Sequence, residues 1–163
     1  MYSQAGQDKW VLDKIGVNGT YLEIGASHPV HINNTYLLEQ NGWKGLSIDI
    51  DDKNLIHWYN YRSNPLIIAD ALTFDYHDVK RIDYLQLDIE PSENTYNCLL
   101  RILNTTKTRF SVITYETDAY IDDRFVKPSR EILQSLGYEL AVPDVMSEFG
   151  PFEDWYIDKL WIK

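Results

Sequence analysis

Five short apolar segments of the sequence each end in carboxylates. The acids, with the residues beside them, are Glu23 with Gly25 and Ala26, Asp49 with Ile50, Asp70 with Ala71, Asp88 with Glu90, and Glu116. Carboxylate oxygens accept hydrogen bonds from hydroxyl and amino groups, and they can also act as general bases or bind divalent cations. Because Asp is common where a strand gives way to a turn, one or two such acids would carry little information. Five in series predict a binding site for a neutral or cationic ligand.

The segments that carry these acids have the composition of buried strands. Residues 21–26, 45–50, 65–70, 82–89 and 110–116 are rich in β-branched and aromatic side chains and are nearly continuously apolar, as is typical of strands covered on both faces. Between them lie stretches with helical spacing, the last of which leads to Gly137, the residue that a helix prefers just past its end. Alternating strands and helices predict a parallel sheet with helices on both faces.

The end of the chain breaks this rhythm. Segments 138–142 and 155–162 are strand-like without a helix of good length between them, so we expect the last strand to run antiparallel. The predicted fold is an α/β, Rossmann-like sheet of seven strands, mostly parallel, which is the arrangement of the class I methyltransferase core. One domain is expected to span residues 1–163, with the N-terminal segment 1–16 packing on the core.

Ligands of such open sheets bind outside the carboxyl ends of the strands, where these acids would meet a nucleoside. Asp49 would accept hydrogen bonds from both ribose hydroxyls, and Asp70 one from the exocyclic amine of adenine. Gly25 lets the backbone approach the ligand because it has no Cβ. Glu23 and Asp88 would face an ammonium group. Neighbours expected to line the same site are Ala26, Ile50 and Ala71.

The turn after the first strand indicates which nucleoside is bound. It reads E-I-G-A-S-H-P-V-H, in which Gly25 is the only glycine. A dinucleotide site needs G-x-G-x-x-G so that a pyrophosphate can contact backbone N–H groups, and the carboxylates would repel that pyrophosphate. S-adenosylmethionine has no phosphate and a net positive charge, so we expect it as the cofactor and S-adenosylhomocysteine as the product. A NAD-dependent oxidoreductase is the first alternative.

The composition argues against several other classes of protein. The chain has 163 residues, with Lys+Arg 15 against Asp+Glu 25 and a formal net charge of -10. Nucleic acid is not an expected partner, because Lys and Arg supply most of the non-specific affinity for phosphates. No apolar run reaches the ~18–20 residues that cross a bilayer, so we expect a cytoplasmic protein without membrane insertion. Cys98, the only cysteine, is interpreted as a core thiol.

Several longer blocks resemble the FkbM-type S-adenosylmethionine-dependent methyltransferases. The blocks are S-Q-A-G-Q-D at 3–8, E-I-G-A-S-H-P…N-N-T-Y-L-L-E at 23–39, N-G-W-K-G-L-S-I-D-I at 41–50, D-Y-L-Q-L-D-I-E at 83–90, S-V-I-T-Y-E at 111–116, S-R-E-I-L-Q-S-L-G-Y at 129–138 and F-E-D-W-Y at 152–156. They follow the family's order through nearly the whole chain. The resemblance implies the same seven-stranded fold and methyl transfer to a hydroxyl, often on a sugar, polyketide or lipid-linked glycan.

The resemblance also assigns roles by position. It implies that Glu23 and Gly25 form the first cofactor motif and that Asp49 is the ribose-binding acid. It also implies that Asp70 is the adenine-side acid and that Asp88 and Glu90 are the acids after the fourth strand. It makes Gln7 a candidate for lining the pocket. The chain departs from the family where His28-Pro29 and Pro91 replace common glycines. These departures motivate a second alternative, a non-catalytic protein that binds the cofactor or a partner.

Methyl transfer to a hydroxyl also needs a group that takes the hydroxyl proton. The candidates are His28, which titrates in the right range, and the acids Asp88, Glu90 and Glu116; together the acids could instead hold a divalent cation. The sequence leaves both possibilities open. Asn34 lies where the next helix begins, so it either caps that helix or contacts the cofactor.

A small-molecule or glycan acceptor has few segments from which to form its pocket. Seven strands and their connections use almost the whole chain, which leaves the N-terminal segment and the loops 117–128 and 143–154. A neighbouring subunit is a further source, so a homo-oligomer stays open.

Overall fold

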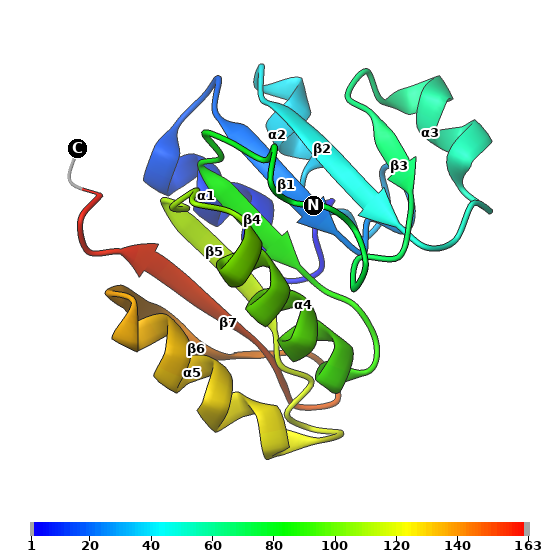
Figure 1. Cartoon of the computed structure of the whole chain (residues 1–163). Coiled ribbons are helices and arrows are strands. Elements are labelled where there is room, and N and C mark those ends of the chain that lie inside the picture. Colours follow the sequence, from blue (N-terminus) through cyan, green and yellow to red (C-terminus); the bar gives the residue numbers. More distant parts are fainter. Residues whose placement is uncertain (1, 162–163) are drawn as a thin grey trace.

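The computed structural model describes residues 2–161, which form one sheet and the helices that cover it (Figure 1). In chain order, the elements are α1 (Gln7–Ile15), β1 (Thr20–Ile24), α2 (Tyr36–Gln40), β2 (Lys44–Asp49), α3 (Leu55–Tyr61), β3 (Leu66–Ile68), β4 (Tyr84–Leu87), α4 (Ser92–Thr105), β5 (Val112–Glu116), the 3-10 helix η1 (Asp123–Phe125), α5 (Val126–Ser135), β6 (Tyr138–Met146) and β7 (Pro151–Asp158).

The sheet has the seven strands, mostly parallel with an antiparallel last strand, that the sequence predicts. Its strand order is β3-β2-β1-β4-β5-β7-β6. The first five of these strands are parallel, while β7 pairs antiparallel with both β5 and β6. The order reverses between β1 and β4, which places a topological switch point, and therefore the expected ligand crevice, at the carboxyl ends of these strands.

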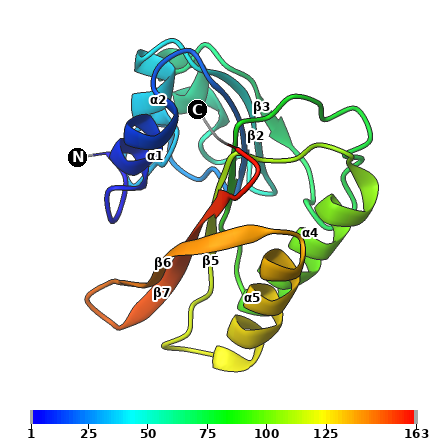
Figure 2. The same ribbon diagram turned by 90° about the vertical axis from the view of Figure 1, so that its left-hand side faces the viewer.

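Side chains alternate between two covered faces of the sheet. On one face, Leu22 and Leu85 belong to a buried cluster that includes residues of α4 and α5. On the other, Tyr21 and Tyr84 pack with Val11 of α1 and with α2. Figure 2 shows α1 and α2 on one side of the sheet and α4 and α5 on the other. The N-terminal segment thus packs on the sheet through α1.

The two last strands begin and end at other residues than predicted. Residues 143–154 were expected as a loop, but most of them belong to the β6–β7 hairpin, whose turn is closed by the N–H of Ser147 donating to the carbonyl of Gly150 at 2.9 Å. The strand predicted at 155–162 is β7, which ends at Asp158; residue 162 lies outside the described residues. β6 is an edge strand whose residues are mostly half-buried or exposed, so it lacks the continuous apolar run that is typical of a strand covered on both faces.

The connection between β3 and β4 contains turns but no helix in the described chain. Tyr76 in this connection is fully buried, and its hydroxyl lies 3.6 Å from the Sγ of Cys98. Burial raises the pKa of the Cys98 thiol to about 11, as expected for a core thiol rather than a nucleophile. Within residues 2–161, no helix has the length and apolar character needed to span a membrane.

Candidate functional site

Two adjoining cavities open at the carboxyl edge of the sheet. The smaller, of about 100 Å³, lies between the ends of β2 and β3 and is lined by residues that include Asp70, Ala71 and Leu72. The larger, of about 750 Å³, extends across the ends of β4 and β5 to the β6–β7 turn. Both are lined by Gly25, Asp49, Ile50, Ile89 and Glu90, so a single elongated ligand can occupy them together.

Gly25 allows the loop after β1 to pass close to the end of β4. Its φ of 79° lies in the region that favours glycine. A Cβ at this position would lie 1.6 Å from the carbonyl oxygen of Asp88, far inside van der Waals contact. The N–H of Gly25 donates to the carbonyl of Ile48 at 2.9 Å, which fixes this crossing beside β2.

Asp49 ends β2 at the boundary between the cavities. Its Oδ2 accepts the N–H of Ser27 at 2.7 Å, and its Oδ1 accepts the N–H of Asp51 at 2.9 Å. Each carboxylate oxygen can accept more than one hydrogen bond, so Asp49 is held in place and can still accept from a diol. Beside it, Ile50 exposes 73% of its surface and forms an apolar wall of both cavities.

The larger cavity contains a cluster of acids from β4, β5 and the loops after them. Burial and the neighbouring Asp88 raise the pKa of Glu116 to about 12. Burial likewise raises the pKa of Asp88, although the hydrogen bond from Glu116 opposes this shift. The two carboxyls therefore share a proton, with Glu116 as the donor. The Oε2 of Glu116 is buried and has no hydrogen-bond partner in the described chain, an environment that disfavours the ionised carboxylate.

Asp118 completes this cluster and was not identified from the sequence. It follows β5, has a φ of 45° and lines the larger cavity. Burial, with smaller contributions from Asp88 and Glu90, raises the pKa of Asp118 to about 6. It is therefore ionised at neutral pH, unlike Glu116. Its position two residues after a strand-end acid is a signal that could have found it.

His28 lines the larger cavity, but its ring takes part in the loop. Its Nδ1 accepts the backbone N–H groups of Val30 at 3.1 Å and His31 at 3.0 Å. Burial and the nearby His31 and His57 lower the pKa of His28. Neutral His28 carries its proton on Nε2 in this arrangement, so it presents a donor rather than a base to the cavity.

Four of the predicted cofactor-binding residues do not line either cavity. They are Gln7, Glu23, Ala26 and Asn34. The amide of Gln7 donates to the Oε2 of Glu153 at 2.8 Å, and the Ser47 hydroxyl donates to the Oε2 of Glu23 at 2.6 Å. Both acids are buried and their pKa values are raised by that burial, to about 8 for Glu153. The other predicted residues, His28, Gly25, Asp49, Ile50, Asp70, Ala71, Asp88, Glu90 and Glu116, all line one or both cavities.

The segments expected to form an acceptor pocket do meet at the larger cavity. Gln4 comes from the N-terminal segment, Tyr120 from the loop after β5, and Ser147, Phe149 and Phe152 from the β6–β7 hairpin. The rings of Tyr120 and Phe149 stack with centroids 6.0 Å apart and an interplanar angle of 24°. Exposed stacked rings at the mouth of a cavity offer a flat apolar surface to a ligand.

Arg62, at the end of α3, holds the loop after β1 and was also missed. Its guanidinium donates to Glu39 at 2.6 Å and to the carbonyl of Pro29 at 3.1 Å, and it also bonds Thr35 and the hydroxyl of Tyr21. The side chains of Arg62 and Glu39 are 0% and 6% exposed. This ion pair fixes the loop that carries Ser27 and His28.

The acids at the strand ends, all within the described residues, are not arranged to hold a divalent cation together. Across residues 2–161, no group of three or more His, Cys, Asp or Glu side chains is placed to hold a metal ion. No Lys or Arg from this part of the chain lines either cavity. The site therefore offers carboxylates, an apolar wall and a pair of aromatic rings.

No protein-family model and no curated protein matches the sequence. Solved structures do match the fold. The chain is similar to a fibrillarin pre-rRNA processing protein from Methanococcus jannaschii, with a TM-score of 0.63 and 15% identity over 96% of this chain and 77% of that one. For an rRNA methylase from Streptococcus thermophilus, the TM-score is 0.60, with 13% identity over 93% of both chains.

A third similar structure is magnesium protoporphyrin IX methyltransferase from Synechocystis PCC 6803 with bound S-adenosylmethionine. Its TM-score is 0.61, with 15% identity over 91% of this chain and 73% of that one. The strand order, the antiparallel last strand and the similarity to these solved structures all indicate the same fold. The chain has the seven-stranded, Rossmann-like methyltransferase fold.

Proposed function

We propose that this protein is an S-adenosylmethionine-dependent methyltransferase whose cofactor lies across the two cavities at the carboxyl edge. The observation that carries the proposal is the lining of these cavities, which combines Asp49, Ile50 and Asp70 with no Lys or Arg from residues 2–161. A phosphate-bearing dinucleotide would lack cationic partners there and would meet several carboxylates. The shared fold with a methyltransferase solved with S-adenosylmethionine supports the same assignment.

The residues that line each cavity indicate which part of the cofactor it holds. Asp49 receives the ribose hydroxyls, Ile50 packs on the adenine, and Asp70 and Ala71 line the small cavity in which the base lies. The sulfonium and the amino acid extend into the larger cavity, where Asp88 and Glu90 attract positive charge.

We further propose Asp118 as the base that takes the proton of an attacking hydroxyl. Asp118 lines the larger cavity beside Asp88 and Glu90 and is the acid with a pKa of about 6, which suits a base at neutral pH. As the hydroxyl oxygen bonds to the methyl carbon, the carbon–sulfur bond breaks and the proton passes to Asp118. The products are the methylated acceptor and S-adenosylhomocysteine.

The acceptor that this cavity suits best is a neutral molecule with hydroxyl groups, such as a sugar or glycan. The stacked rings of Tyr120 and Phe149 can pack on a sugar face, and the acids repel phosphates. An RNA acceptor, suggested by the rRNA methylase among the similar structures, would meet that repulsion. The resemblance of blocks such as 23–39 and 83–90 to the FkbM-type enzymes supports the sugar assignment.

Transfer of an isotopically labelled methyl group tests the proposal. Wild-type protein is incubated with labelled S-adenosylmethionine and a panel of neutral sugars, glycans and RNA, and label is expected on a neutral acceptor. Asp118→Asn should lower the rate by about 10²–10⁴-fold, while Asp13→Asn, an exposed change in α1, should leave it unchanged. Cofactor binding without label on any acceptor would favour a non-catalytic binding protein.

A further inference from the structure

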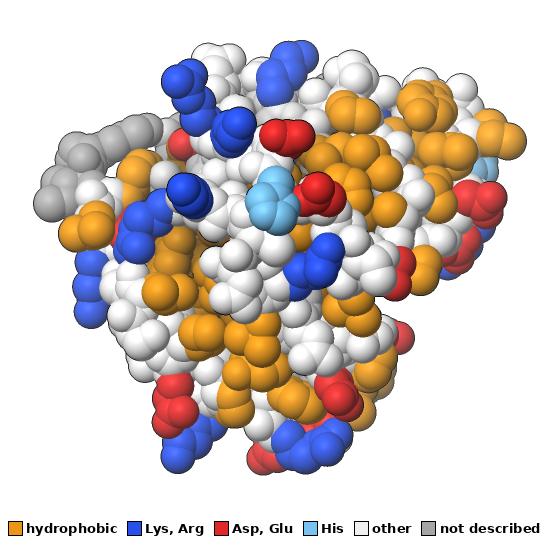
Figure 3. Space-filling model, in the orientation of Figure 1, with side chains coloured by type: hydrophobic (Ala, Val, Ile, Leu, Met, Phe, Trp, Pro, Cys, Tyr) orange, Lys and Arg blue, Asp and Glu red, His pale blue; other side chains and the backbone are white. Residues whose placement is uncertain are grey.

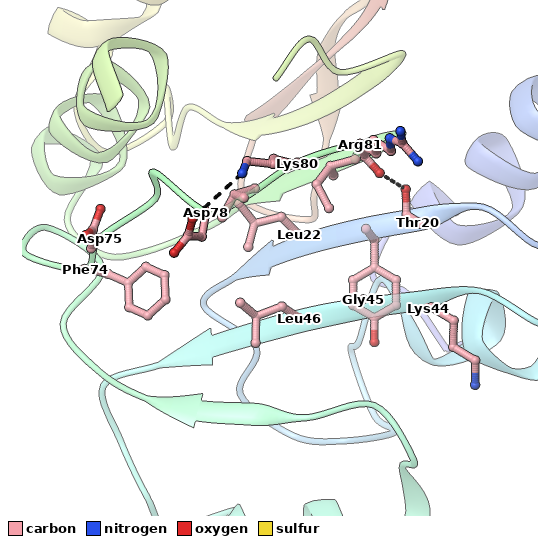
Figure 4. A pocket seen from close by; sticks show the side chains of 13 residues that line it. Thr20, Leu22, Lys44, Gly45, Leu46, Phe74, Asp75, Asp78, Lys80 and Arg81 are labelled. Atoms are coloured by element: carbon pink, nitrogen blue, oxygen red, sulfur yellow. Dashed lines mark hydrogen bonds and ion pairs between the residues drawn. The ribbon is translucent and has the colours of Figure 1, made fainter. Parts of the chain in front are cut away.

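The β3–β4 connection leaves a second hollow, on the sheet face that also carries α4 and α5. Parallel strands are usually joined by a helix that covers the sheet, and here residues 69–83 contain turns instead. A cavity of about 360 Å³ results, with Leu22 and Leu46, which are register partners on β1 and β2, as its floor. Phe74, Val79 and Ile82 of the connection line the same cavity. Figure 4 shows Phe74 and the two leucines around this space.

Apolar surface continues from this cavity to the edge of the sheet. Ile67 of β3 lies beside Ile48 in the register and is 36% exposed, and β3 is an edge strand of three residues. Figure 3 shows hydrophobic side chains gathered over β2, β3 and α3 on this face. A continuous apolar surface of this kind marks an interaction site on an otherwise acidic protein.

The two ends of the cavity carry opposite charge. Lys44 and Arg81 lie at the end near Thr20, and Asp75 and Asp78 lie toward the other end, with Lys80 between the two groups (Figure 4). Among residues 2–161, neither Lys44 nor Arg81 has an ion-pair partner. At the other end, Asp75 contacts the exposed His77 at 2.6 Å. Asp78 has a looser contact of 3.9 Å with Lys80, and both of these side chains are largely exposed.

We propose that this face binds a second copy of the chain about a two-fold axis that passes through the cavity region. A two-fold contact brings a surface against itself, rotated by half a turn. That rotation places Lys44 and Arg81 of one copy over Asp75 and Asp78 of the other, twice in each dimer, and encloses the two apolar cavities between the copies. A polyanion or an anionic membrane would attract only the basic end and would be repelled by the acidic one, so the charge pattern favours a second copy.

Charge reversal at each end tests this arrangement, with mass measured by sedimentation over a range of concentrations. Wild type is expected to dimerise. Lys44→Glu with Arg81→Glu makes both ends acidic, and Asp75→Lys with Asp78→Lys makes both ends basic, so each double variant should raise the dissociation constant at least about tenfold. All four residues are exposed, and circular dichroism checks that each variant folds.

Mixing the two double variants distinguishes the proposed two-fold interface from any other mode of association. An acidic copy and a basic copy complement each other at both ends of a two-fold contact, so an equimolar mixture should form a heterodimer as tightly as wild type dimerises. A wild type that remains monomeric at about 100 μM overturns the proposal, since a stable interface of standard size binds well below that concentration. Double variants that dimerise like wild type, or a mixture that stays monomeric, overturn it as well.

Discussion

Gly25 is the residue on which the shape of both cavities depends most directly. It lines each of them, has a positive φ, and leaves no room for a Cβ against the carbonyl of Asp88. Gly25→Ala should therefore push β1 and β4 apart and lower the free energy of unfolding by about 3 kcal/mol or more, as measured by urea denaturation.

Gly6→Ala is the matched control for this change. Gly6 has a φ of 94°, but no atom lies within 4 Å of the Cβ that alanine would add. The control therefore carries only the cost of a left-handed conformation, about 1–2 kcal/mol. Equal losses for the two variants would contradict the close approach at Gly25.

Glu23 shows why the sequence predicted the chemistry of the site better than it predicted where each side chain lies. It was expected to face the ligand, but it lies inside the β1 ladder, opposite Ser47 and Gln86. A side chain within a ladder points to one face of the sheet, and here that face is covered by α1. Asp49 and Gly25 instead lie at the last ladder position or beyond it and reach the carboxyl edge.

Glu116 makes the stability of the protein fall with rising pH. Its folded pKa of about 12 is far above the ordinary 4.5, so the folded state keeps a proton that the unfolded chain releases once the pH exceeds the ordinary value. This contribution to stability is complete at low pH and is lost as pH rises, at up to about 1.4 kcal/mol per pH unit. Glu116→Gln, which mimics the protonated form, should flatten the dependence between about pH 5 and pH 8.

The exposed Glu93, in the first turn of α4, supplies the control. Urea denaturation of Glu93→Gln across the same pH range should give the wild-type slope. A Glu116→Gln variant that also keeps the wild-type slope would show that Glu116 holds no proton in the folded protein.

At the scale of elements, Arg62 ties α3 to the loop after β1. Arg62→Met removes the charge, so the carbonyl of Pro29 loses this donor and the buried Oε2 of Glu39 loses its ion-pair partner, while the Oε1 of Glu39 still accepts from Ser63. The change should cost about 3–5 kcal/mol of stability. The comparison is Arg124→Met, because Arg124 forms an exposed pair with Asp122 and should cost about 1 kcal/mol or less. Chemical denaturation that gives similar losses for both would contradict the structural role of the Arg62 pair.

The elements themselves were largely predictable, because buried parallel strands have a distinctive composition. Segments 21–26 and 45–50 predicted β1 and β2, and the missing helix near the end predicted the antiparallel β7. The turns were not predictable in the same way. Asp118 reaches the site because of a positive φ after β5, and Phe149 because of a tight turn between β6 and β7. Such geometry has no periodicity in the sequence.

For the whole molecule, the charge of -10 gives cofactor binding a dependence on salt. S-adenosylmethionine has a sulfonium charge that S-adenosylhomocysteine lacks, so the acids around the larger cavity attract the first ligand more. Raising ionic strength from about 0.01 M to about 1 M shortens the Debye length from about 30 Å to about 3 Å. The affinity for S-adenosylmethionine should fall more than that for S-adenosylhomocysteine, as measured by calorimetry at each salt concentration. Equal salt dependence would contradict an electrostatic role for the acids.

The most direct measurement of the central claim is a calorimetric titration of the wild-type protein with S-adenosylhomocysteine and, in parallel, with NADH. The two cavities should bind S-adenosylhomocysteine at one site per chain, Asp49→Ala should remove most of that affinity, and NADH should give no saturable heat. Tighter binding of NADH, or no binding of S-adenosylhomocysteine even at millimolar concentration, would contradict the account.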